Sequence, residues 1–60
     1  MNYFYEVFET EKGWKWRIED ETGKLLKASS GQFHSKDDAN FIAKMWAKQM
    51  FGIEVNEKLH

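Results

Sequence analysis

Basic and aromatic side chains alternate along the first half of this chain in a way that could hold nucleic acid. Three basic residues in strand-like runs are candidate phosphate contacts: Lys15, Arg17 and Lys27. If these cations share one sheet face with Phe4 and Phe8, the two rings could stack on bases. However, Glu6 and Glu19 would fall on the same face, and the net charge is -1. Nucleic-acid binding therefore stays open as an alternative, but the sequence does not favour it.

Residue types that carry catalysis are present, but they lack the partners that catalysis needs. There is no Cys, and Ser29, Ser30 and Ser35 lack a set of His and acidic partners. Asp37 and Asp38 stand at a predicted helix start, where the helix dipole explains them. The glycines are single turn residues rather than a phosphate-binding loop. We therefore expect no enzyme active site, no cofactor and no small-molecule substrate.

Length and composition point to one small domain. The 60 residues predict a single domain over residues 1–60, with an ordered core at about residues 3–55. Such small domains usually need disulfides, a metal or a partner subunit for stability. Disulfides are excluded because there is no Cys, and no metal site is expected because His34 and His60 lack ligand spacing. Dense aromatic packing, with 17% aromatic residues, or pairing of subunits must supply the stability.

The chain shows no sign of membrane insertion or export. No apolar run is long enough to span a membrane, and the amino terminus lacks the basic start of a signal peptide. The absence of Cys fits a reducing compartment. We expect a soluble, cytoplasmic protein that does not bind membranes.

The candidate residues must be positioned by strands in the first half of the chain and by a helix in the second. Alternation of apolar and polar residues predicts strands at residues 3–9, 14–19 and 24–29, joined by polar loops that end in Gly. Residues 30–33 are expected to lead away from the sheet. The predicted fold class is α+β, a three-stranded antiparallel β-meander packed on one α-helix (β-β-β-α).

The helix has clear start and stop signals. Ser35 is a suitable N-cap, residues 39–51 hold good helix formers without Pro, and Gly52 stands where a C′ glycine belongs. Residues 53–55 could add a short carboxy-terminal edge strand or fold back on the core. Residues 56–60 are expected to fray.

The helix and the second strand each have one apolar face. A helical projection gives one stripe: Ala39, Ile42, Ala43, Trp46 and Met50. We expect this stripe to pack on the sheet face that carries Trp14, Trp16 and Ile18, with Tyr5 and Val7 joining it.

Large apolar residues are left over on two surfaces. Phe4 and Phe8 fall on the open sheet face, and Phe41 and Met45 are helical neighbours that point away from the stripe. Exposed apolar patches of this kind usually mark contact sites. The sequence therefore predicts a non-catalytic binding module, most simply a homodimer that uses one of these pairs. The alternative is that residues 53–55 cover one patch.

The order of these motifs resembles the YegP-like family of small domains of unknown function. The resemblance covers about residues 3–46 and rests on these motifs: Tyr5-Glu6-Val7-Phe8, Lys15-Trp16-Arg17-Ile18, residues 23–29, Gly31, Phe33, Ser35-Lys36, Ala39 and Ile42. Lys15 departs from the family's Arg, and the helix end is unusually rich in Trp, Met and Phe. The resemblance implies β-β-β-α units that pair as tandem repeats or homodimers, and it implies no settled biochemical activity.

A second resemblance supports the nucleic-acid alternative. The general plan is similar to ethylene-response-type DNA-binding domains and to the amino-terminal domains of tyrosine integrases, which lay an open three-stranded sheet in the major groove. The matching positions are Gly13, Trp16, Ile18, Gly31, Phe33 and Ala39. Those domains carry many more basic residues on their strands, so we rank this resemblance below the first.

Overall fold

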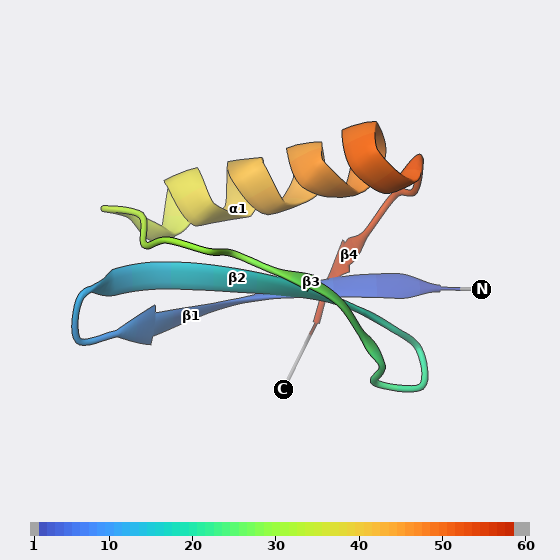
Figure 1. Cartoon of the computed structure of the whole chain (residues 1–60), viewed down its shortest axis with the longest axis horizontal. Helices are drawn as coiled ribbons and strands as arrows, with labels where there is room; N and C mark the ends of the chain where they lie inside the picture. Colours follow the sequence, from blue (N-terminus) through green and yellow to red (C-terminus); the bar gives the residue numbers. More distant parts are fainter. Residues whose placement is uncertain (1, 59–60) are drawn as a thin grey trace.

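The computed structural model describes residues 2–58 as one helix packed on a four-stranded sheet. Its elements are β1 (Tyr3–Thr10), β2 (Gly13–Asp20), β3 (Leu25–Ala28), α1 (Lys36–Trp46), the π-helical turn η1 (Ala47–Phe51) and β4 (Asn56–Glu57). Figure 1 shows α1 and η1 running as one continuous helix along one face of the sheet. The predicted α+β class is confirmed, whereas the sheet has one strand more than the predicted meander.

The extra strand, β4, makes the sheet mixed rather than wholly antiparallel. The strand order is β3-β2-β1-β4, and β4 runs parallel to β1 while the other pairs are antiparallel. Of the two alternatives for residues 53–55, the edge strand does not form there, and the extra strand lies one residue later, at Asn56–Glu57. The amide of Lys58 donates to the carbonyl of Tyr5 at 2.8 Å, so this end of the chain is held against β1 rather than frayed. Residues 59–60 lie outside the described part of the chain.

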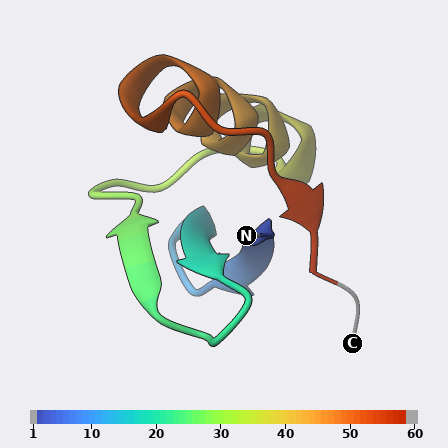
Figure 2. The ribbon, with the colours of Figure 1, turned by 90° about the vertical axis from the view of Figure 1, so that its right-hand side faces the viewer.

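The core lies between the helix and the predicted face of the two long strands. Tyr5 pairs with Ile18 and Val7 with Trp16, which puts these four side chains on one face. The buried core consists of Tyr5, Trp16, Ile18, Ala39, Ala43 and Ala47. Alanine side chains are short, so they let the helix lie close to the sheet while the large Trp16 ring fills the space between. Figure 2 shows the helix above the sheet, with β3 and β4 at its two edges.

The predicted signals at the two helix ends are confirmed. The amide of Asp38 donates to Ser35 Oγ at 3.2 Å, so Ser35 is the N-cap. Gly52 ends the helix with a left-handed φ of 67°, a conformation that glycine adopts at little cost. Within residues 2–58, no helix is long and apolar enough to cross a membrane.

The last helical turn moves one predicted core residue to the surface. Met50 was expected in the buried stripe, but it is 62% exposed, and Ala47 is fully buried instead. The cause is η1, because a π-helical turn holds more residues than an α-helical turn and changes the direction in which later side chains point.

The loop after β3 returns to the sheet instead of leading away from it. Phe33 and Trp14 form an isolated bridge in which each amide donates to the other residue's carbonyl, at 2.8 and 2.9 Å. Gly13 makes this close approach possible. Its φ is 137°, and a Cβ at this position would lie 2.7 Å from the Phe33 carbonyl oxygen. The expectation that residues 30–33 leave the sheet is therefore wrong.

Candidate functional site

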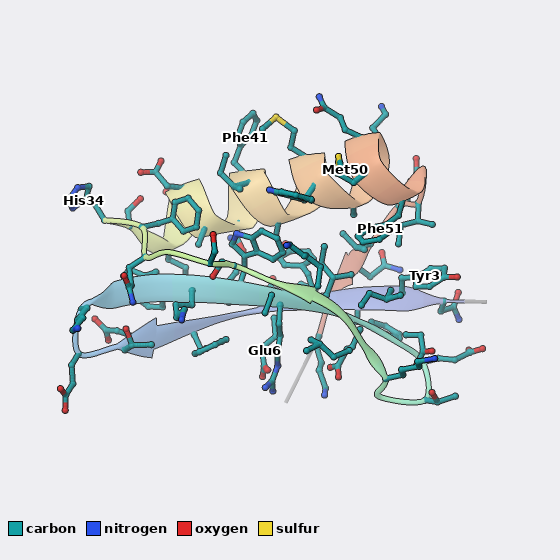
Figure 3. The ribbon with its side chains drawn as sticks, in the orientation of Figure 1. Tyr3, Glu6, His34, Phe41, Met50 and Phe51 are labelled. Carbon is teal, nitrogen blue, oxygen red and sulfur yellow. The ribbon has the colours of Figure 1, made fainter. Side chains whose placement is uncertain are left out.

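The outer face of α1 carries the most exposed of the predicted contact residues. Phe41 is 65% exposed and Met45 is 37% exposed. They stand four residues apart and are therefore neighbours on the helix surface. Figure 3 shows Phe41 rising from the side of the helix that faces away from the sheet. The structure thus brings this predicted pair together on a surface that the sheet does not cover.

The carboxy-terminal segment does not cover this pair. Ile53 and Val55 are partly buried and pack against the core cluster. These two residues fill space beside the helix, whereas Phe41 and Met45 keep their exposure. Of the two alternatives for residues 53–55, folding back on the core is the one observed.

Two opposite charges flank the apolar pair along the helix. Asp38 lies in the first helical turn and Lys48 in the last, and both are exposed. Asp38, Phe41 and Met45 are spaced by three and four residues along α1, and Lys48 follows three residues later at the start of η1, before most of the π-helical turn. We call these four residues, three on α1 and Lys48 at the start of η1, the outer stripe of α1. The spacing can be read from the sequence. The order of the two charges suggests a contact surface only once the structure shows that this side of the helix is exposed.

The open sheet face holds the other predicted pair in a less exposed setting. Phe4 is partly buried, and Phe8 is 37% exposed. The guanidinium carbon of Arg17 lies 5.6 Å from the centre of the Phe8 ring, and such a cation–π contact covers part of that ring. The sheet-face pair is therefore a smaller apolar target than Phe41 and Met45.

Ion pairs cross the same open face. Glu6, which lies opposite Arg17 in the register, forms an ion pair with it. Lys58 Nζ lies 2.6 Å from Glu19 Oε1. Both carboxylates are largely buried, so two acidic groups stand among the basic side chains of this face. The Glu19–Lys58 pair could not be predicted because it depends on β4, which is only two residues long.

Lys27 does not share the open face with the other two candidate phosphate contacts. It pairs with Ile18, which faces the helix, and its Nζ lies 4.9 Å from the centre of the Trp46 ring. The expectation that Lys15, Arg17 and Lys27 form one basic patch is therefore wrong. The cause is a register irregularity between Ile18 and Glu19, which disturbs simple alternation along β3.

A groove of about 630 Å³ lies at the end of the open face, between the β2–β3 turn and β4. Asp20, one of its lining residues, organises the turn: its Oδ1 accepts from Thr22 Oγ1 at 2.6 Å and from the Lys24 amide at 3.0 Å. These hydrogen bonds lower the pKa of Asp20 below its usual 3.8. Asp20 is therefore a turn residue that stays ionised near neutral pH, not an acid ready to give up a proton.

Two of the three hydroxyl groups considered for catalysis, those of Ser29 and Ser35, have structural partners. Ser35 caps α1, and Ser29 Oγ accepts from the Trp16 amide at 3.2 Å. Within residues 2–58, no group of three or more His, Asp or Glu side chains is placed to hold a metal ion. His34 lies exposed just before the helix (Figure 3). The described residues carry exposed or partly exposed apolar side chains in two places, on the outer stripe of α1 and on the open sheet face, and the two places differ in exposure and charge.

In comparisons with protein-family models, curated proteins and solved structures, nothing matches this chain.

Proposed function

We propose that this chain is a small non-catalytic binding module that pairs with a second copy of itself through the outer stripe of α1. The observation that carries the proposal is the exposure of Phe41 and Met45 on the helix face opposite the core. Large apolar side chains gathered on one helix face are costly in water and are stabilised by burial against a partner. The resemblance to YegP-like domains also implies pairing.

The order of charges along the stripe favours a second copy as the partner. A two-fold axis at the centre of the stripe would pack the two helices antiparallel. Asp38 of each copy would then face Lys48 of the other, while Phe41 and Met45 meet in the middle. The stripe is therefore complementary to itself, with an apolar centre and opposite charges at its ends.

The open sheet face supports the DNA-binding alternative less well. With Lys27 on the helix side, only Lys15 and Arg17 remain of the predicted basic patch, and Arg17 is already paired with Glu6. Carboxylates among the cations would repel the phosphates that such a face must hold. We therefore keep self-association as the proposed function and treat DNA binding as the outcome that would replace it.

Charge reversal across the stripe tests the proposal. We expect Lys48→Glu to raise the dimer dissociation constant at least about tenfold, because it places a carboxylate opposite Asp38 of the partner. Adding Asp38→Lys should restore pairing, since each copy then again meets an opposite charge. Lys15→Glu, on the open sheet face, is the matched control and should leave the constant unchanged. Sedimentation velocity over a concentration series measures all four proteins.

Two results would overturn this arrangement. If Lys48→Glu and the double variant both pair like the wild type, the stripe is not the interface. If Lys15→Glu alone disrupts pairing, the open sheet face is the interface instead.

A further inference from the structure

Two methionine side chains are exposed on the helical half of the chain, and one of them belongs to the outer stripe of α1. Met45 is 37% exposed and lies in α1, whereas Met50 is 62% exposed and lies in η1, outside the stripe (Figure 3). Neither residue is among those that form the core cluster or pack against it. A change in the polarity of either side chain therefore leaves the core of the domain in place.

The methionine sulfurs are the atoms of this chain that react most readily with a peroxide. The sequence has three Met and no Cys, so no thiol competes for the oxidant. A sulfur lone pair attacks one oxygen of hydrogen peroxide, and the O–O bond breaks. The other oxygen leaves as hydroxide, takes the proton of the transferred oxygen and becomes water. The thioether is oxidised by two electrons to a sulfoxide, which is polar where the thioether was apolar.

Met45 stands near the centre of the proposed contact between two copies. The antiparallel arrangement that sets Asp38 of one copy against Lys48 of the other also sets Met45 against Phe41, because both pairs of positions have the same midpoint along the helix. Contact between a thioether sulfur and an aromatic ring is favourable. A sulfoxide oxygen in the same place would lose water and face an apolar ring, which is unfavourable. Oxidation should therefore weaken the contact between the two helices.

We propose that oxidation of Met45 by a peroxide separates the paired chains, which makes the outer stripe of α1 a redox-sensitive contact. The effect rests on the proposed pairing through this stripe, and every pair contains Met45 twice. Because pairing covers the sulfur of Met45, it should also slow the oxidation of that residue. Met50, outside the stripe, should be oxidised at the same rate in single and paired chains.

Treatment of the full-length protein with hydrogen peroxide tests both directions of this coupling. Trypsin cleaves after Lys44 and Lys48, so mass spectrometry measures the sulfoxides of Met45 and Met50 in different peptides. We expect the oxidation rate of Met45 to fall as the protein concentration is raised through the dissociation constant, while the rate of Met50 stays constant. Sedimentation velocity should give a dimer dissociation constant at least about tenfold higher for the oxidised protein, since each copy brings a buried polar group without a partner.

Three substitutions assign the effect to one sulfur. Met45→Leu keeps an apolar side chain of similar volume, so it should pair like the wild type and keep its dissociation constant after peroxide treatment. Met50→Leu is the matched control, and its pairing should be as sensitive to peroxide as that of the wild type. Met45→Gln carries a polar group permanently and should weaken pairing without any oxidant. Methionine sulfoxide reductases should restore pairing of the oxidised wild type.

The outcomes separate this inference from the proposed pairing. If the untreated protein is a single chain at every concentration, pairing fails, and redox control fails with it. If the untreated protein pairs and the protein oxidised at Met45 pairs equally well, pairing stands and redox control alone is wrong. Separation of peroxide-treated Met45→Leu would assign the effect to another residue and overturn the inference. The near-ultraviolet circular dichroism of the oxidised protein should be unchanged, and its loss would overturn the inference because oxidation would then unfold the domain.

Discussion

Replacing Phe41 with Gln should weaken self-association without changing the stability of the single domain. Phe41 is 65% exposed, so pairing can bury about 130 Å² of a ring whose full area is about 200 Å². At about 25 cal/mol per Å², this burial is worth ~3 kcal/mol per copy and ~6 kcal/mol for both copies. Glutamine is a good helix former and retains roughly a third of that contact through its stem, so the expected loss is ~4 kcal/mol. The dimer dissociation constant should therefore rise about a thousandfold.

The same substitution should leave the single domain intact. Because Phe41 lies outside the core cluster, the free energy of unfolding of the monomer should change by less than about 0.5 kcal/mol. Sedimentation velocity measures the dissociation constant, and urea unfolding at concentrations below that constant measures monomer stability.

Leu25→Thr is the matched control for this experiment. Leu25 is also exposed, but it lies opposite Glu19 on the open sheet face, and Thr suits a strand. It should pair as the wild type does. An unchanged dissociation constant for Phe41→Gln, or a large increase for Leu25→Thr, would refute the assignment of the interface to α1.

Three further substitutions test the fold that positions these surfaces. Gly13→Ala should destabilise the domain by about 1–3 kcal/mol, because a Cβ there would lie 2.7 Å from the Phe33 carbonyl oxygen at a φ of 137°. Gly31→Ala has open space around its Cβ and should show no such loss in the same thermal unfolding assay. Ser35→Ala removes the N-cap and should cost about 1 kcal/mol in urea unfolding, whereas Ser35→Asp should retain most of the stability. Because the pKa of Asp20 is lowered on folding, its carboxylate stabilises the fold above pH 3.8, and this contribution is lost as the pH falls through the folded pKa. The stability of Asp20→Asn should therefore fall less than that of the wild type between about pH 5 and about pH 2, and equal slopes would contradict this reasoning.

Local patterns in the sequence were sufficient to predict the main layers of the fold. Alternation along β1 and β2 identifies the core face because side chains of a strand point alternately to its two sides. The two helix ends were predicted from Ser35 and Gly52. The side chain of Ser35 and the backbone freedom of Gly52 each act within one helical turn. The exposure of Phe41 and Met45 follows from the same periodicity, since the core stripe of α1 lies on the opposite side.

The features that could not be predicted depend on contacts between distant residues or on small irregularities. Lys27 changes face because of the register irregularity beside Ile18, and nothing in the local composition marks it. Met50 becomes exposed because of the π-helical turn. The sequence of that turn does not differ from that of an ordinary α-helix, so it gives no sign of the change. β4 is too short to show a pattern of its own and is held by its pairing with β1.

Light scattering after size exclusion, over a dilution series with and without a mixed-sequence DNA duplex, tests the central claim most directly. We predict the mass of two chains at high concentration, a decline toward one chain on dilution, and no change on adding DNA. A single-chain mass at every concentration would contradict self-association. Co-elution with DNA at low salt, lost as salt is raised, would contradict it in favour of DNA binding by the open sheet face.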